Sequence, residues 1–245
     1  DYGQHDVATI LNHTESQEVV WSPGYAPETI GVYRTDRAYS VGDVILINDY
    51  SPRGPRTCIS PTVPGEYEYS YWTEGCYPEM TGYYDNTKTY SIGDIAWDSN
   101  SGEVITCVVN VDSPEEYDSE HWTAGYAPSI LGIYDETRTY NVGDVVAVDM
   151  DESEYSPRVW TCIFPVTSPE PFDEAKWVDQ YCPDVIGIYN SNVTYTVGDV
   201  VVEGDGSYTV YTCISNNPSS PDDDGWIGGY YPDISIYDPT AEYVI

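Results

Sequence analysis

Four tryptophans recur at matching places in the chain, and a tyrosine follows each of them closely. They are Trp72, Trp122, Trp177 and Trp226, with Tyr77, Tyr126, Tyr181 and Tyr230. A sugar ring can lie flat on an exposed aromatic ring, so these side chains are candidates for a glycan-binding platform. For the tryptophans we favour a second interpretation, in which each fills the core of a small sheet. Each tyrosine is also a candidate hinge that packs on the next repeat.

The six cysteines follow the same repeat. Cys58, Cys107, Cys162 and Cys213 occupy one position in successive repeats, and Cys76 and Cys182 are additional. We favour the disulfide bonds Cys58–Cys76 and Cys162–Cys182 because they close the shorter loops, although sequence does not fix the connectivity. The alternatives are the pairs Cys76–Cys107 and Cys182–Cys213, or six thiols buried as small apolar groups. Disulfide bonds would place the chain in an oxidising, extracellular compartment.

Two acidic runs are candidates for calcium binding through carboxylate oxygens. One contains Asp149, Asp151 and Glu152, and the other contains Asp222, Asp223 and Asp224. For both runs we favour solvated loops, and apart from Ca²⁺ we expect no cofactor. Asn12 and Asn192 each open an Asn-x-Thr triplet, which is the acceptor pattern for N-glycosylation.

The chain lacks the sequence patterns of common catalytic centres. It has no Gly-x-Ser-x-Gly elbow, no phosphate-cradling glycine loop and no histidine-containing metal motif. An aspartate follows glycine at a repeated position, as Asp43, Asp94, Asp144 and Asp199. We expect these aspartates to form turns in which the carboxylate accepts backbone hydrogen bonds. The sequence therefore predicts a protein that is not an enzyme.

All of these residues belong to an internal repeat with a period of about 50 residues. Each copy contains Tyr-x-x-Gly-Asp, at residues 39–43, 90–94, 140–144 and 195–199, followed by Thr-Cys, Trp and Tyr-x-Pro or a close variant. We assign complete β modules, numbered 1 to 4, to residues 30–79, 80–129, 130–184 and 185–233. Residues 1–29 correspond to the back half of a module, and residues 234–245 to the front of a following one.

Short strands must position the repeated residues. Each module begins with an apolar stretch such as residues 131–134, and passes through a turn and the Gly-Asp pair into a β-branched run such as residues 144–148. Helical periodicity is nearly absent, so the pattern predicts an all-β fold, a linear tandem array of small modules that is incomplete at both ends. Modules of this size bury little surface alone and need support from their neighbours.

The charge balance excludes several classes of partner. Asp and Glu number 42 against 8 Lys and Arg, which gives a formal net charge of −34. Nucleic-acid binding needs a basic face that this chain lacks. No stretch is apolar enough for a membrane helix, so we expect no membrane insertion. Salt or divalent cations would relieve the self-repulsion, which suits a saline or calcium-rich medium, although the charge could equally serve solubility alone.

The order of the repeated motifs resembles the family 5 and 12 carbohydrate-binding modules attached to bacterial chitinases. Module 4 carries the clearest match, at residues 195–201 and 211–213, Pro221 and Trp226. The resemblance covers the four complete modules and implies small twisted β modules that bind crystalline chitin through exposed aromatics. Similar modules are common in phage tail fibres and secreted adhesins. Two positions depart from the family, because tyrosine replaces the tryptophan near the module start and Cys-Ile or Cys-Val replaces an aromatic pair.

We therefore expect a non-catalytic structural protein that is secreted, at the cell surface or on a virion. Identical subunits would join head to tail into a fibre, filament or phage tail-fibre shaft, with strand complementation between incomplete modules. The alternative is the polysaccharide-binding region, chitin foremost, of a secreted glycan-degrading enzyme. A third hypothesis is a segment of a calcium-dependent adhesin.

Overall fold

The computed structural model describes residues 8–12, 20–23, 28–47, 54–149, 157–204, 208–216, 218–221, 224–232 and 234, with the backbone alone for the first two ranges. Two compact units divide the chain: one holds β1 to β8 and the start of β9, and the other holds most of the remaining residues. Asp149 and Asp224 lie in the described part, whereas Asp151, Glu152, Asp222 and Asp223 lie outside it.

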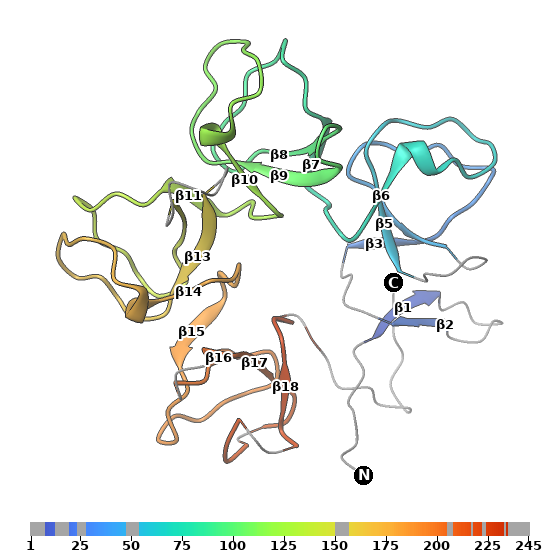
Figure 1. The fold of residues 1–245 in the computed structure, drawn as a ribbon. Coiled ribbons are helices and arrows are strands. Elements are labelled where there is room, and N and C mark those ends of the chain that lie inside the picture. Colours follow the sequence, from blue (N-terminus) through green and yellow to red (C-terminus); the bar gives the residue numbers. More distant parts are fainter. Residues whose placement is uncertain are drawn as a thin grey trace. The chain divides into compact units, whose positions relative to one another are not determined.

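Four small sheets of four strands repeat along the chain (Figure 1). They contain β3 (Thr29–Val32), β4 (Val44–Leu46), β5 (Pro55–Cys58) and β6 (Trp72–Glu74); β7 (Met80–Tyr83), β8 (Ile95–Asp98), β9 (Glu103–Cys107) and β10 (Trp122–Ala124); β11 (Ile130–Ile133), β12 (Val145–Val148), β13 (Arg158–Cys162) and β14 (Trp177–Val178); and β15 (Val185–Ile188), β16 (Val200–Val202), β17 (Val210–Cys213) and β18 (Trp226–Gly228). Short 3₁₀ helices precede the last strand of modules 1 to 3, as η1 (Tyr69–Tyr71), η2 (Ser119–His121) and η3 (Glu174–Lys176).

The strand pairing is the same from module to module. The first strand runs parallel to the second, as where Val185 lies opposite Val200. The third and fourth strands are antiparallel, and the repeated cysteine always lies opposite the repeated tryptophan, as in Cys213 opposite Trp226. The antiparallel pair β1 (Ala8–Asn12) and β2 (Val20–Pro23) has the same register, with Ile10 opposite Trp21. The backbone of this pair therefore matches the last two strands of a module.

The all-β class predicted from the sequence is confirmed. The described residues form strands and short 3₁₀ helices, and none of their helices is long and apolar enough to cross a membrane. The linear arrangement of the modules is not supported. Within the second unit, consecutive modules pack against one another through shared buried residues, as the limited size of each module requires.

One face of each sheet packs on an aromatic core inside the module. In module 3 the ring of Tyr134 stacks on Tyr140 at 5.1 Å, and both rings meet Trp177 edge to face at 5.6 and 5.3 Å. The same three rings recur as Tyr33, Tyr39 and Trp72 in module 1 and as Tyr189, Tyr195 and Trp226 in module 4. Edge-to-face rings add to the free energy of burial, so this triad is the fixed centre of these modules.

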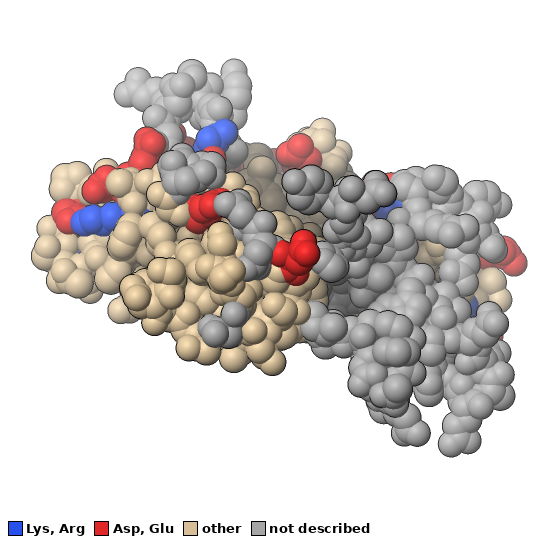
Figure 2. All heavy atoms as spheres, turned by 90° about the horizontal axis from the view of Figure 1, so that it is seen from below, with Lys and Arg blue, Asp and Glu red and all other residues tan. Residues whose placement is uncertain are grey.

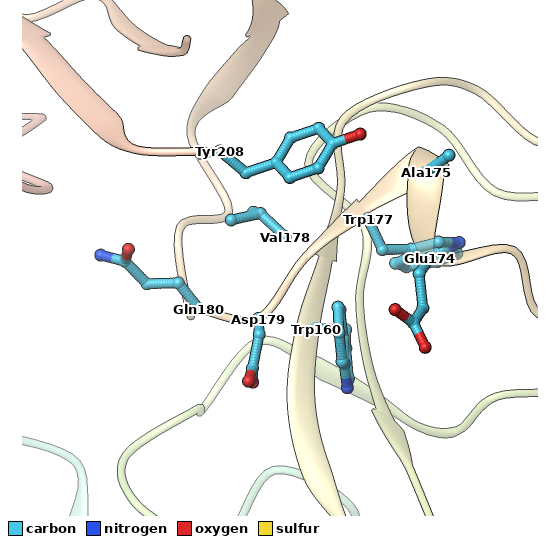
Figure 3. Close-up of a pocket in the computed structure, with 8 residues that line it drawn as sticks. All are labelled: Trp160, Glu174, Ala175, Trp177, Val178, Asp179, Gln180 and Tyr208. Carbon is cyan, nitrogen blue, oxygen red and sulfur yellow. The ribbon is translucent and has the colours of Figure 1, made fainter. Parts of the chain in front are cut away.

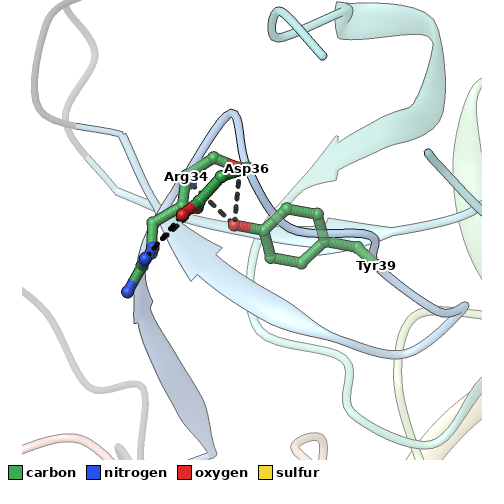
Figure 4. A network of polar contacts seen from close by, with 3 residues as sticks. All are labelled: Arg34, Asp36 and Tyr39. Atoms are coloured by element: carbon green, nitrogen blue, oxygen red, sulfur yellow. Dashed lines mark hydrogen bonds and ion pairs between the residues drawn. The ribbon is translucent and has the colours of Figure 1, made fainter. Parts of the chain in front are cut away.

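The second tyrosine of the triad also closes the turn that precedes it. In module 1 the hydroxyl of Tyr39 accepts a hydrogen bond of 2.7 Å from the backbone N–H of Arg34 (Figure 4). The guanidinium of Arg34 holds the carboxylate of Asp36 through two hydrogen bonds of 2.9 and 2.8 Å. Tyr140 and Tyr195 make the same hydroxyl contact with the backbone of Asp135 and Asn190. The repeated tyrosine is therefore both a core residue and a turn anchor.

The opposite face of the central strand is buried against the neighbouring module. In β16, Val201 belongs to the aromatic core of module 4, while Val200 and Val202 pack with Ile163, Val178 and Cys182 of module 3. In β12, Val146 faces the core of module 3, while Val145 and Ala147 pack with Val108 and Ala127 of module 2. Burial on both faces explains why these strands read as unbroken apolar runs.

The Gly-Asp pair joins the start of the central strand to the end of its own module. In module 3 the N–H of Gly143 donates to the carbonyl of Cys162 at 2.9 Å, and the carboxylate of Asp144 accepts from the N–H of Asn141 at 2.7 Å. Asp43 and Asp199 accept the same bond in their modules, so their predicted role in turns is confirmed. Gly143 has a φ of +91°, and a Cβ there would lie 2.4 Å from the carbonyl oxygen of Pro183. Only glycine fits this position.

We predict that Gly143→Ala destabilises the chain far more than Gly125→Ala does. Gly125 has a similar φ of +97°, but a Cβ there would meet nothing within 4 Å. Both changes impose a strained φ, so their difference isolates the clash with Pro183. We expect that difference to be at least about 2 kcal/mol in the free energy of unfolding. Urea titration of both variants measures it, and equal losses would contradict the proposed contact.

Candidate functional site

The four repeated tryptophans lie in the cores of their modules. The exposed fractions of Trp72, Trp122, Trp177 and Trp226 are 6%, 0%, 1% and 5%. Each lies on the last strand of its sheet, opposite the repeated cysteine. A ring this deeply buried offers no face to a sugar, so the core interpretation is confirmed and the tryptophans do not form the predicted glycan platform.

The tyrosines of the predicted platform form a ladder across the module junctions of the second unit. The rings of Tyr126 and Tyr181, and those of Tyr181 and Tyr230, meet edge to face with centroids 6.4 Å apart. The hydroxyl of Tyr181 lies 2.9 Å from Ser129 Oγ, and that of Tyr230 donates to the carboxylate of Asp184. Burial, together with the bond to Asp184, raises the pKa of Tyr230. The ring contacts match the predicted hinge that packs on the next module.

Tyr77 occupies a different position from the other three tyrosines. Counting back from the closing proline, its equivalents are Ala127, Cys182 and Tyr231, whereas the equivalents of Tyr126 are Cys76, Tyr181 and Tyr230. The N–H of Tyr77 donates to Thr57 Oγ1 at 2.9 Å, and that same hydroxyl donates to the carbonyl of Gly75 at 2.8 Å. Thr106, Thr161 and Thr212 make the same pair of bonds in modules 2 to 4. The threonine before each repeated cysteine thus holds the turn that leads to the next module.

The predicted disulfide bonds are absent. None of the six cysteines forms a disulfide bond, including Cys58, Cys76, Cys162 and Cys182. In module 3, Cys162 packs in the aromatic core, whereas Cys182 packs in the core shared with module 4, so the two side chains lie in different clusters. Each repeated cysteine instead donates its thiol hydrogen to the carbonyl two residues on, as Cys162 does to Phe164 at 3.0 Å. These cysteines behave as small buried hydrophobes.

Burial also makes the thiols unreactive. It raises the pKa of Cys58, Cys76, Cys162 and Cys182 from 9.0 to about 11. The thiolate is the nucleophile and the metal ligand, so none of these four groups is prepared for either role near neutral pH.

On the face drawn in Figure 2, the Asp and Glu residues that the structure describes do not gather in one large patch. Asp149 and Asp224 are exposed, and no group of three possible metal ligands occurs among the described residues. The other four candidate calcium ligands lie outside those residues. Asn192 is exposed in a turn, while Asn12 ends β1, for which the backbone alone is described.

A hollow of about 480 Å³ opens in the second unit where modules 3 and 4 meet. It is lined by Trp160, Glu174, Ala175, Trp177, Val178, Asp179, Gln180 and Tyr208 (Figure 3). Trp160 comes from β13, Tyr208 from the hairpin between β16 and β17, and the others from η3, β14 and the residues just after β14. It brings together three aromatic side chains, two carboxylates and a primary amide, and it is the candidate binding site of the described chain.

The sequence reasoning did not identify Trp160 or Tyr208, although one signal was present. At the position two residues before the repeated cysteine, modules 1, 2 and 4 have Arg56, Ile105 and Tyr211, whereas module 3 alone has a tryptophan. Tyr208 comes from the connection between β16 and β17, whose length differs from that of the equivalent connections in the other modules. Its place beside module 3 depends on the contact between modules, which the repeat does not show.

Comparison with models of protein families and with curated protein sequences found no match to this chain. The resemblance to carbohydrate-binding modules therefore stays a prediction, carried by the order of the repeated motifs.

We predict that the unfolded chain contains six titratable thiols without prior reduction. Free cysteines react once denaturant exposes them, whereas two disulfide bonds would leave two thiols. Ellman's reagent in concentrated guanidinium chloride makes the count, and the folded protein at pH 8 serves as the slow-reacting control. Two thiols in the unreduced, unfolded chain would contradict the structure.

We also predict that the chain loses stability at alkaline pH. In the unfolded state the thiols ionise near pH 9, whereas in the folded state the pKa of Cys58, Cys162 and Cys182 is about 11. The unfolded state therefore binds fewer protons above pH 9, and the free energy of unfolding falls as pH rises. Burial raises the pKa of Tyr67 to about 12, which adds to the loss. Urea titrations between pH 7 and 11 test this, and constant stability would contradict it.

Proposed function

We propose that the chain is a non-catalytic structural protein in which β modules are joined head to tail. The observation that carries the proposal is the shared core at each module junction of the second unit. There, apolar residues of two consecutive modules form one buried cluster, as Ile163 and Val178 of module 3 do with Val202 of module 4. A chain built this way transmits mechanical load from one module to the next, because separating two modules exposes buried apolar surface.

The two sides of a junction use different residues. The earlier module contributes the residue after its repeated cysteine and the segment before its closing proline, as Val108 and Ala127. The later module contributes its first strand and its central strand, as Ile130 and Val145. A contact between unlike surfaces can be repeated without limit, within a chain or between chains. Head-to-tail association of identical chains into a fibre is therefore part of the proposal.

Close approach of backbones supports the same contact. The first strand of each later module contains a glycine with positive φ, where a Cβ would meet a carbonyl of the earlier module. For Gly132 the distance to the carbonyl oxygen of Val108 would be 3.0 Å, and for Gly82 the distance to that of Ile59 would be 3.3 Å. The junction is thus built from matched positions on both modules, as expected of a repeating structural element.

Location outside the cell stays part of the proposal. It is supported by the net charge of −34, which suits a medium rich in salt or divalent cations. Disulfide bonds, the second reason for that location, are absent from the structure.

A substitution on one side of a junction should destabilise the module on the other side. We predict that Ile163→Ala in module 3 lowers the hydrogen-exchange protection of residues 200–202 in module 4, because Ile163 packs in the core shared by both. Val146→Ala is the matched control, since Val146 packs in a cluster that contains residues of module 3 only. Mass-spectrometric hydrogen exchange reads both modules at once. Loss of protection confined to module 3 in both variants would overturn the shared core.

Association of chains is tested on the purified full chain. We expect light scattering to rise with protein concentration and electron microscopy to show fibres when salt and Ca²⁺ screen the acidic surface. Monodisperse monomers at every salt, calcium and protein concentration would overturn the fibre proposal, and would leave the shared cores within the chain unaffected.

A further inference from the structure

The hollow at the junction of modules 3 and 4 has an apolar floor and a polar rim. Trp177 and Val178 lie at its base, with exposed fractions of 1% and 5%. Tyr208 lines it from the side of module 4 and Trp160 from the side of module 3 (Figure 3). Glu174, Asp179 and Gln180 are exposed around it. Its volume, about 480 Å³, lies in the range of small-molecule sites.

Tyr208 is held in a strained backbone conformation. Its φ is +50°, and no other residue except glycine has a positive φ in the part of the chain that the structure describes. This conformation is unfavourable for a bulky side chain and persists where surrounding packing enforces it. Here the ring packs on the core shared by modules 3 and 4 and also lines the hollow. The packing that enforces this conformation therefore holds the aromatic ring of Tyr208 against the hollow.

Carboxylates give the hollow a negative charge. In the view of Figure 3 the indole of Trp160 lies between the carboxylates of Glu174 and Asp179. Asp179 is paired with Arg158 at 2.9 Å, and both side chains are partly exposed. Glu174 has no side-chain hydrogen bond or ion pair to any residue that the structure describes. One carboxylate thus stands uncompensated beside aromatic rings, in a chain whose net charge is −34.

The groups that line the hollow in module 3 are absent from the equivalent positions of module 2. The equivalents of Trp160, Glu174 and Asp179 in module 2 are Ile105, Ser119 and Ala124. Module 2 therefore lacks the aromatic wall and both carboxylates at these positions. A repeat that only builds a scaffold does not require these three differences, so module 3 has a feature beyond the structural role proposed above.

We propose that this hollow binds a small molecule bearing an alkylammonium group. An ammonium ion is attracted to the π face of Tyr208, which is half-buried, and its alkyl groups bury apolar surface on the buried side chains of Trp160, Trp177 and Val178. The free carboxylate of Glu174 supplies the counter-charge, and Gln180 can donate or accept a hydrogen bond at the rim. Anionic ligands are repelled by the same carboxylates. A neutral apolar ligand would leave Glu174 uncompensated next to it, so a cation is favoured over its uncharged analogue.

The test compares choline with 3,3-dimethylbutan-1-ol, which has the same shape but no charge. Titration of the full chain, followed by NMR of the indole N–H groups and by calorimetry, gives the two affinities at low salt. We expect choline to bind at least about tenfold more tightly than the neutral analogue. Equal affinities would show a merely apolar hollow and would overturn the proposal, as would the absence of binding by choline.

Two substitutions locate the site. Glu174→Gln, which keeps size and removes one charge, should weaken choline binding about fivefold or more and leave the neutral analogue unaffected. Glu136→Gln is the matched control, since Glu136 is an exposed carboxylate of the same module that does not line the hollow. Tyr208→Leu should weaken choline binding by removing one aromatic face. Thermal melting of each variant confirms folding, and an equal loss in the Glu136 variant would show that net charge, not the hollow, attracts choline.

Discussion

Burial of the central strand on both of its faces is the constraint on which the rest of this structure depends. In β16, alternate valines point into an aromatic core of their own module and into an aliphatic core shared with the module before it. Alternation of side chains along a strand makes this division unavoidable once both faces are covered. A module that lacked its neighbour would expose Val200 and Val202, two of its most deeply buried residues. The packing between modules therefore stabilises each module by keeping this apolar surface out of water.

Hydrogen bonds and close backbone contacts fix the turns and junctions between the two kinds of core. The threonine before each repeated cysteine uses one hydroxyl to donate to a carbonyl and accept from an N–H, and so fixes the turn that leads to the next module. Gly82, Gly132 and Gly187, each the third residue of the first strand of its module, allow two backbones to approach. The glycine of the Gly-Asp pair lies against the carbonyl of the closing proline. Residues that look like separate motifs in the sequence thus meet in pairs in space: threonine with the turn, glycine with proline, cysteine with tryptophan.

Because the motifs repeat, the all-β class and the core residues inside each module could be predicted from the sequence. The strands around residues 145–148 and 200–202, the turn role of Asp144 and the burial of Trp177 all follow from local composition and spacing. The disulfide bonds were predicted wrongly, because loop length does not report which face of the sheet a side chain occupies, and Cys162 and Cys182 occupy different cores. The ladder of Tyr126, Tyr181 and Tyr230 was foreseen only as a hinge, and the hollow was missed, because Trp160 and Tyr208 come together through packing between modules.

The recurrence of the junction contacts at the same positions of the repeat has a consequence for how such a gene can change. Unequal crossing-over that adds or removes one whole period returns every glycine to its proline carbonyl and every valine to its partner cluster, wherever in the period the breakpoint falls. A gain or loss inside the Gly-Asp turn would instead bring a side chain into a place that admits only hydrogen, whereas the loop between the second and third strands already differs in length from module to module. We therefore expect related chains to differ in length by whole modules.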